Sequence, residues 1–251
     1  MERLWTAEDV ARPEISAAEL EDFYAYPPGL EHPWLRVNFV SSLDGAVTVR
    51  GSSRELSAPA DRRVMALIRS LSDVVLVGAG TALVEGYRGV KPNEVRNELR
   101  SRLGMPPLPP IAVVTRRCSL EPDSPVVADT LVPTIVITCR SAPESRRAAL
   151  ADAGADVIVA GEDVVDLPAA IAALGERGLR RIGGEGGPTL FGDLIAADLV
   201  DELCLTVSPL LTGGNAGRIA QGPPVQPRGM RLLSALHAES LLLLRYGRLR
   251  A

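Results

Sequence analysis

The sequence predicts an α/β protein in which helices cover both faces of a mostly parallel β-sheet. Three observations support this fold class. Short β-branched runs alternate with stretches of helical periodicity along most of the 251 residues. Several of these runs are apolar throughout, which is typical of strands buried on both faces. Hydrophobic residues make up 46% of the chain, so a large core can form.

A strand, a turn and a helix open the pattern. Residues 34–40, WLRVNFV, alternate with period two and predict a strand, and the Asp44-Gly45 pair after them signals a turn. Residues 57–72 predict a helix, because Pro59 suits a first helical position and the apolar residues that follow share one face. Residues 73–81, DVVLVGAGT, predict a buried strand that ends in glycines.

The same alternation continues to the end of the chain. The proline-rich stretch GMPPLPP is interpreted as a loop that leads into the next strand, because that strand follows at once. Helices are expected at 93–103, 144–153, 167–176 and 188–197, and strands at 111–115, 134–138, 156–160, 179–184, 199–211 and 240–250. The last strand is expected to run antiparallel to its neighbour, which makes the sheet mixed.

Composition excludes several classes of function. The net charge of −4 argues against a nucleic-acid-binding protein, which normally carries a basic surplus. The N-terminus lacks the apolar segment of a signal peptide, and no apolar run approaches the ~18 residues of a membrane span. A cytoplasmic protein without membrane or nucleic-acid partners is therefore expected.

The cysteines and histidines do not indicate a metal site. Cys118, Cys139 and Cys204 are far apart and form no CxxC pair, so neither zinc nor a disulfide framework is predicted. Cys139 and Cys204 lie in strand-like runs and are expected to be buried thiols. His32 and His237 have no ligand spacing and are interpreted as structural.

Ligands of open parallel sheets bind beyond the carboxyl ends of the strands, so the loops that follow the strands are the candidates for a site. These loops comprise residues 41–46, 78–81, 115–117, 183–189 and 208–214. Four of the five contain glycine, and all five contain a hydroxyl group.

Two of these loops are rich in glycine. GGEGGPTL, residues 183–190, has the parts of a phosphate cradle, because glycines let a phosphate approach the unpaired N–H groups of a helix N-terminus. The alternative is a tight turn that uses glycine for its conformation. VGAGT, residues 77–81, offers similar N–H groups and the Thr81 hydroxyl, or is a simple turn. It lacks the dinucleotide fingerprint G-x-G-x-x-G, since Leu83 occupies the third glycine position.

The loop after residues 111–115 is basic. Thr115, Arg116 and Arg117 could clamp a phosphate there, or the arginines could be solvated at the surface. If the ligand is a dinucleotide, these residues would bind its 2′-phosphate, which favours NADPH over NADH. The sequence has neither a G-x-x-x-x-G-K-[ST] loop nor a G-x-S-x-G elbow.

Taken in order, FVSSLDGAV, DVVLVGAGT, GGEGGPTL and VDELCLTVSPLLTGG resemble the reductase domain of bacterial riboflavin biosynthesis. That domain reduces the ribosylamino group of a phosphorylated pyrimidine with NADPH. The resemblance covers residues 34–250 and implies the dihydrofolate-reductase-like fold, a three-layer α/β sandwich, and a homodimer. It also implies a single reductase domain over residues 34–251, with residues 1–33 as an N-terminal extension packed on it.

The resemblance assigns roles to individual residues. The catalytic carboxyl groups, which would orient the heterocycle or relay a proton, are Asp44 and Glu185. The other residues expected to face the substrate are Asn38, Ser57, Arg69 and Glu85. Those expected to bind NADPH are Gly78, Gly80, Thr81, Thr115, Arg116, Gly184, Gly186, Gly187 and Thr189.

The sequence also departs from the family pattern. Many members carry a lysine where this chain has Asn38, and an Asn-Pro pair is missing from ALVEGYRGVKP, where Glu85 holds the acidic position. Arg88 or Lys91 could replace the residues that bind the substrate phosphate. The H-x-E and P-C-x-x-C motifs of the zinc deaminase often fused to this reductase do not occur. Two alternatives stay open: a dihydrofolate or pterin reductase on the same fold, and an NADPH-binding module without catalysis.

Overall fold

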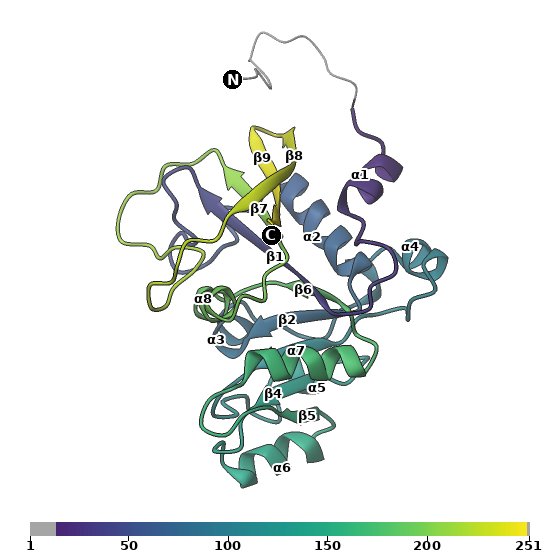
Figure 1. Cartoon of the computed structure of the whole chain (residues 1–251), viewed down its shortest axis with the longest axis vertical. Helices are drawn as coiled ribbons and strands as arrows, with labels where there is room; N and C mark the ends of the chain where they lie inside the picture. Colours follow the sequence, from purple (N-terminus) through teal and green to yellow (C-terminus); the bar gives the residue numbers. More distant parts are fainter. Residues whose placement is uncertain (1–13, 250–251) are drawn as a thin grey trace.

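The computed structural model describes residues 14–249, and these build one nine-stranded sheet (Figure 1). The strands are β1 (Trp34–Ser42), β2 (Val74–Gly78), β3 (Ile111–Val114), β4 (Ile135–Thr138), β5 (Asp156–Val159), β6 (Arg181–Gly184), β7 (Glu202–Ser208), β8 (Met230–Ala238) and β9 (Leu241–Arg248). Their order across the sheet is β5-β4-β3-β2-β6-β1-β7-β9-β8. The first seven positions are parallel, whereas β9 pairs antiparallel with β7 and with β8. The predicted mostly parallel, mixed sheet is therefore confirmed.

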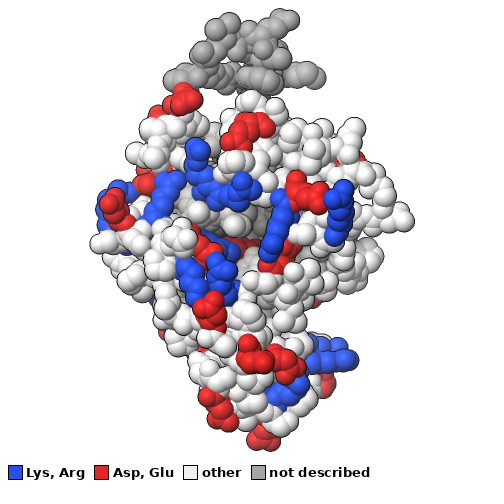
Figure 2. Space-filling view, turned by 180° about the vertical axis from the view of Figure 1, so that it is seen from behind, with Lys and Arg blue, Asp and Glu red and all other residues white. Residues whose placement is uncertain are grey.

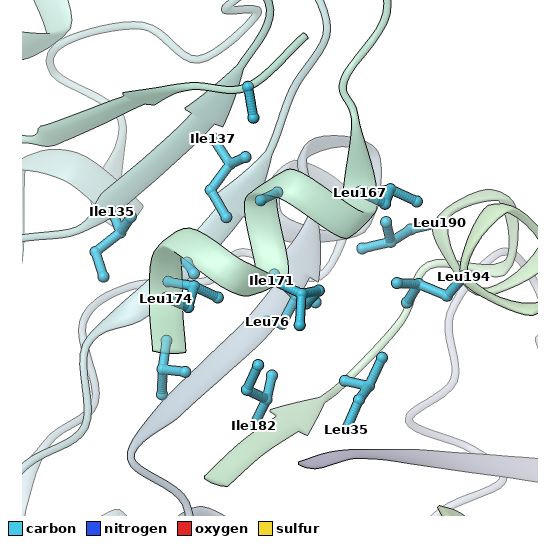
Figure 3. Close-up of a cluster of buried hydrophobic side chains, with 14 of the residues drawn as sticks. Leu35, Leu76, Ile135, Ile137, Leu167, Ile171, Leu174, Ile182, Leu190 and Leu194 are labelled. Atoms are coloured by element: carbon cyan, nitrogen blue, oxygen red, sulfur yellow. The ribbon is translucent and has the colours of Figure 1, made fainter. Parts of the chain in front are cut away.

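Helices cover both faces of the sheet. They are α1 (Ala17–Tyr24), α2 (Pro59–Leu71), α3 (Ala79–Val84), α4 (Asn97–Arg102), α5 (Pro125–Ala128), α6 (Glu144–Asp152), α7 (Leu167–Glu176) and α8 (Pro188–Ala196), with a 3₁₀ turn η1 at Pro92–Glu94. Helices α7 and α8 share one hydrophobic cluster with the sheet, and Figure 3 shows Leu76, Ile171 and Ile182 together where α7 crosses the strands. Helices α3, α5 and α6 pack on the opposite face.

The alternation of side chains along the strands explains the three layers. Leu76 belongs to the cluster beneath α7, and the next residue, Val77, belongs to the cluster on the other face. Both are at most 1% exposed. Helix α2 packs on that second face beside β7 and β9, where it shares a cluster with Tyr24 and Leu243.

Some elements differ from the predicted ones. The strand predicted at 73–81 ends at Gly78, so residues 79–81 form the first turn of α3. The helix predicted at 93–103 is divided into η1 and the short α4, and the strand predicted at 199–211 covers only Glu202–Ser208. Helices α1 and α5 and the edge strand β8 were not predicted. Much of the surface of β8 is exposed, so no burial pattern marked that strand.

A buried ion network joins residues 24–36 to the C-terminal strands. Arg36 is fully buried, and its Nε and Nη2 donate to the two oxygens of Glu202 at 2.9 and 3.1 Å. Its Nη1 donates to the Tyr24 carbonyl at 2.6 Å, and Arg245 Nε donates to Glu202 at 2.8 Å. Burial alone would raise the pKa of Glu202, but the charge of Arg36 and the contacts with Arg245 outweigh it and hold the pKa below its ordinary value.

Candidate active site

Two adjoining cavities lie at the carboxyl ends of the parallel strands. One, of about 660 Å³, lies between β1, α2 and residues 80–94, and we call it the α2 cavity. The other, of about 1030 Å³, runs along the first turns of α3, α7 and α8, and we call it the α8 groove. Both are lined by Gly80, Thr81, Gly187 and Pro188, so they meet where the two glycine-rich loops come together.

The two glycine loops are in direct contact. The N–H of Gly78 donates to the carbonyl of Gly186 at 2.8 Å, and the N–H of Glu185 donates to Leu76 at 2.9 Å. A Cβ atom on Gly187 would lie 2.1 Å from Thr81 Oγ1, and Gly186 has a φ of +100°. Close packing and backbone conformation therefore both require glycine in this loop.

The same loops also present free N–H donors. Gly78 and Gly187 are the N-caps of α3 and α8, and neither helix start has a side-chain cap. The first N–H groups of a helix have no partner within it, and residues of both helix starts line the α8 groove, so these N–H groups are available to a phosphate there. Gly80 has open space beside it, and Thr189 lines the groove as expected. Gly184 lies in β6 against Val37 and lines neither cavity.

Basic side chains line part of the α8 groove. Thr115, Arg116 and Arg117 all line it, as the sequence analysis expected. Arg116 Nε donates to the Asp163 carbonyl at 2.9 Å, which fixes the side chain and leaves its other N–H groups for a ligand. Thr115 Oγ1 instead accepts from the N–H of Ser119 at 3.0 Å and shapes the loop.

Glu185 lies at the wall of the α2 cavity in a bidentate ion pair. Arg69 Nε and Nη2 each donate to it at 2.7 Å, and the Tyr87 hydroxyl donates to Oε2 at 2.8 Å. The side chains of Arg69 and Glu185 are 11% and 4% exposed. Burial and the neighbouring Glu185 carboxylate raise the pKa of Tyr87 well above its ordinary value, so its hydroxyl stays a donor at neutral pH.

Asp44 is not brought into this cavity. Its carboxylate accepts from Ser42 Oγ and from the N–H groups of Thr212 and Gly213, the latter at 2.7 Å. The Ser42 hydroxyl and the Gly213 N–H hold its pKa well below the ordinary value. Asp44 is exposed and ties the loop after β1 to the loop after β7, and its catalytic role stays a prediction.

The remaining expected substrate residues line the α2 cavity. Ser57 donates to Asp61 at 2.6 Å, and Glu85 accepts from the N–H and hydroxyl of Ser53 at 3.1 Å each. Asn38 Oδ1 is buried there without a hydrogen-bond partner among residues 14–249. Arg88 also lines the cavity.

Exposed guanidinium groups surround the α2 cavity. Arg54, Arg62 and Arg88 line it, and the side chains of Arg54 and Arg88 are 77% and 51% exposed. Lys91 is not among the lining residues and pairs with Asp129 instead. Figure 2 shows basic side chains on both sides of a hollow in the middle of one face of the molecule.

Comparison with known proteins places the chain in a family. The family model of the RibD C-terminal domain matches residues 33–243. The chain belongs to the RibD C-terminal domain family. The 2,5-diamino-6-ribosylamino-4(3H)-pyrimidinone 5′-phosphate reductase of Archaeoglobus fulgidus is 35% identical over 184 residues, which cover 72% of this chain and 83% of that protein. This RibD-family chain is accordingly an oxidoreductase.

Solved structures agree on the fold. A pyrimidine reductase-like protein from Corynebacterium diphtheriae superposes with a TM-score of 0.75 at 24% identity, covering 87% of this chain and 93% of that one. A deaminase/5-amino-6-(5-phosphoribosylamino)uracil reductase from Thermotoga maritima gives a TM-score of 0.65 at 19% identity over 87% of this chain and 57% of that one. The RibD-family chain thus has the dihydrofolate-reductase-like fold that its sequence resemblance implied.

The α8 groove fits the nicotinamide cofactor that reductases of this family use. Its donors are main-chain N–H groups at two helix starts, hydroxyl groups and arginines, a set suited to a pyrophosphate and a further phosphate. No group of three or more His, Cys, Asp or Glu that could hold a metal occurs within residues 14–249. Nor does any described helix have the length and apolarity to cross a membrane.

Several polar residues of the α2 cavity were missed in the sequence, among them Asp61. Asp61 lies in the first turn of α2, is 5% exposed and lines the cavity. An aspartate in a first turn is normally interpreted as a partner of the helix dipole, so its position gave no reason to single it out. The available signal was Ser57, four residues earlier, whose hydroxyl orients the carboxylate.

Proposed function

We propose that this protein is an NADPH-dependent reductase that acts on the ribosylamino group of a ribosylaminopyrimidine 5′-phosphate. The observation that carries the proposal is the meeting of the two cavities at Thr81 and Gly187. A cofactor in the α8 groove and a heterocycle in the α2 cavity would face each other at that point. The names of relatives such as the Archaeoglobus fulgidus reductase support this choice of substrate class.

The cofactor half of the proposal rests on main-chain donors. We assign the pyrophosphate to the first turns of α3 and α8, around Gly80, Thr81, Gly187 and Thr189. Arg116 and Arg117 would bind the 2′-phosphate that distinguishes NADPH from NADH. The bound cofactor supplies the hydride, and the protein's task is to hold donor and acceptor carbons at about 3–3.5 Å and exclude water.

The substrate half rests on the polar wall of the α2 cavity. Reduction adds a hydride to C1′ of the ribose, breaks the C1′–O4′ bond and leaves a proton on O4′. We assign Glu185 to the orientation of the substrate, because Arg69 and Tyr87 hold its carboxylate in one place. The exposed guanidinium groups of Arg54 and Arg88 would bind the 5′-phosphate. Lys91 is not assigned to the phosphate, because it pairs with Asp129.

We further propose that the enzyme is cytoplasmic and that it is a homodimer, as the family resemblance implies. The edge strand β8 supports this, because Leu232 and Leu233 on it are 42% and 39% exposed. Sedimentation velocity would give a mass near twice 26.6 kDa if the proposal holds.

Steady-state oxidation of NADPH tests the function. The purified protein is assayed with a ribosylaminopyrimidine 5′-phosphate and, separately, with dihydrofolate. Faster turnover of the pyrimidine phosphate supports the proposal, and faster turnover of dihydrofolate would make the protein a pterin reductase instead. Thermal shift with NADPH and, separately, with NADH tests the choice of cofactor. A ligand at a hundredfold its Kd adds about 2.7 kcal/mol of stability, so the cofactor that the protein binds more tightly gives the larger rise in Tm. Binding of NADPH without turnover of any heterocycle would indicate a non-catalytic module.

A further inference from the structure

The connection between β1 and α2 contains a short hairpin at the wall of the α2 cavity. The N–H of Ser52 donates to the Val49 carbonyl at 3.1 Å, and the N–H of Val49 donates back to Ser52 at 2.9 Å. Between them, Arg50 and Gly51 have φ values of +50° and +86°, as a tight hairpin turn requires. Arg54 follows this turn and lines the cavity, so the conformation of the hairpin decides where its guanidinium group lies.

Glu85 holds the hairpin against the end of α3. Its Oε1 accepts from the N–H and the hydroxyl of Ser53 at 3.1 Å each, and its Oε2 accepts from the Ser52 hydroxyl at 3.3 Å. Arg54 Nη2 donates to the main-chain carbonyl of Glu85 at 3.1 Å. Four hydrogen bonds from three consecutive residues therefore meet at one glutamate, whose side chain is only 17% exposed.

The segment that carries Arg88 is anchored by other contacts. On one side of Arg88, the Tyr87 hydroxyl donates to Glu185 at 2.8 Å. On the other side, the N–H of Gly89 donates to the Asp129 carbonyl at 3.0 Å. This wall of the cavity is thus fixed without the hairpin, whereas the hairpin is joined to it through the residue that ends α3.

The contacts of Glu85 leave it poorly suited to bind the substrate directly. Hydrogen bonds from Ser52 and Ser53 already occupy most of the positions at which its carboxylate can accept. An ionised carboxylate also repels a phosphate, because both are negative. Arg54 uses one N–H on the Glu85 carbonyl, and its side chain is 77% exposed, so its other donors can reach a phosphate.

We infer that Glu85 is a positioning residue, which holds the hairpin so that Arg54 and Arg88 face the same substrate phosphate. The inference rests on the proposed function and gives Glu85 a different part in it, because the family resemblance placed this residue against the substrate itself. An arginine held in place before binding loses less side-chain freedom when the phosphate arrives.

Glu85→Ala tests the inference by the preference for a phosphorylated substrate. The measured quantity is the ratio of kcat/KM for the ribosylaminopyrimidine 5′-phosphate to that for its dephosphorylated counterpart. Release of the hairpin should lower this ratio about fivefold, because Arg54 must then be ordered by the phosphate. A direct contact between Glu85 and the ribose would weaken both substrates equally, so an unchanged ratio in the folded variant would overturn the inference.

Two further variants sharpen this comparison. Glu55→Ala is the matched control, because Glu55 follows the same hairpin, is 50% exposed and lines neither cavity, and it should leave the ratio unchanged. In an Arg54→Met background, Glu85→Ala should lower the ratio no further, since the arginine through which it acts is gone. A further fivefold loss in that background would show that Glu85 acts by itself.

Hydrogen exchange gives a readout that does not depend on turnover. In Glu85→Ala the N–H of Ser53 loses its acceptor, so the amides of residues 50–54 should exchange about fivefold faster, while the rest of the chain keeps its wild-type rates. Ser53→Ala removes only the hydroxyl contact and should shift the exchange rates and the substrate ratio in the same direction by less. Wild-type exchange of residues 50–54 in Glu85→Ala would overturn the inference.

The outcomes separate the inference from the function beneath it. If wild-type protein reduces neither pyrimidine compound with NADPH, the proposed function fails and the inference fails with it. If wild-type protein prefers the phosphorylated compound but folded Glu85→Ala keeps both the substrate ratio and the exchange rates, the reductase function stands and only the role of Glu85 is overturned.

Discussion

Replacing Glu202 with Gln removes the single negative charge at the centre of the buried ion network and keeps the shape of the side chain. Glu202 is 1% exposed and accepts three hydrogen bonds from the guanidinium groups of Arg36 and Arg245. Those arginines are 0% and 8% exposed, so the substitution leaves two buried cations facing a neutral amide. Arg36 keeps its bonds to the carbonyls of Tyr24 and Ala25.

The expected loss of stability follows from these contacts. Breaking a buried ion pair by removing one partner costs about 3–5 kcal/mol, because an uncompensated charge remains. The amide of Gln still offers one acceptor, and Arg36 retains its two carbonyls, so we expect the low end, about 3 kcal/mol. For a chain of this length that corresponds to a fall in Tm of roughly 6–12 °C.

Urea unfolding at pH 7 and 25 °C measures this change. Glu162→Gln is the control, because it breaks the ion pair with Arg140 at the surface, where the two side chains are 73% and 68% exposed. The control is expected to cost less than about 0.5 kcal/mol. A loss below about 1 kcal/mol in Glu202→Gln would refute the reasoning, since the buried network would then contribute no more than a surface pair.

The pH dependence of the same variant checks the electrostatic cause. The pKa of Glu202 is lowered in the folded protein from its ordinary value of 4.5. Its contribution is therefore fully present above pH 4.5 and is lost as the pH falls through the folded pKa. The difference in unfolding free energy between wild type and Glu202→Gln should stay constant from pH 7 to 5 and shrink below pH 4.5. A difference that is unchanged at pH 3 would contradict this.

Three further predictions concern the cavities. Gly187→Ala should lower the free energy of unfolding in urea by about 1–3 kcal/mol, because its Cβ would lie 2.1 Å from Thr81 Oγ1. The loss should be smaller in a Thr81→Ala background, and equal losses in both backgrounds would disprove the contact. Arg116→Ala should raise the Kd for NADPH about tenfold and leave that for NADH unchanged, and parallel losses for both would mean that Arg116 does not bind the 2′-phosphate. Arg88→Met should raise KM for the phosphorylated substrate about tenfold with little change for the dephosphorylated compound, whereas equal effects on both would exclude a phosphate contact.

The fold was largely predictable because most strands are short, apolar and separated by helical segments. Residues 111–115 and 134–138 were found nearly to the residue, since their burial on both faces leaves continuous apolar runs. The strand β8 was missed because an exposed edge carries no such pattern. The start of α3 at Ala79 was missed because VGAG was interpreted as the end of a strand, whereas Gly78 is the helix N-cap.

The two halves of the site differ in how far the sequence could predict them. The proposed phosphate donors of the α8 groove are main-chain N–H groups at helix starts. Glycine-rich loops that follow strands predict such groups from the sequence. The α2 cavity depends on which side chains keep a free polar atom after folding, and local sequence does not contain that information. Glu185 lines this cavity and its catalytic role stays a prediction, since three hydrogen bonds from Arg69 and Tyr87 occupy its carboxylate. Asp61, which no motif marked, also lines this cavity and accepts a hydrogen bond from Ser57.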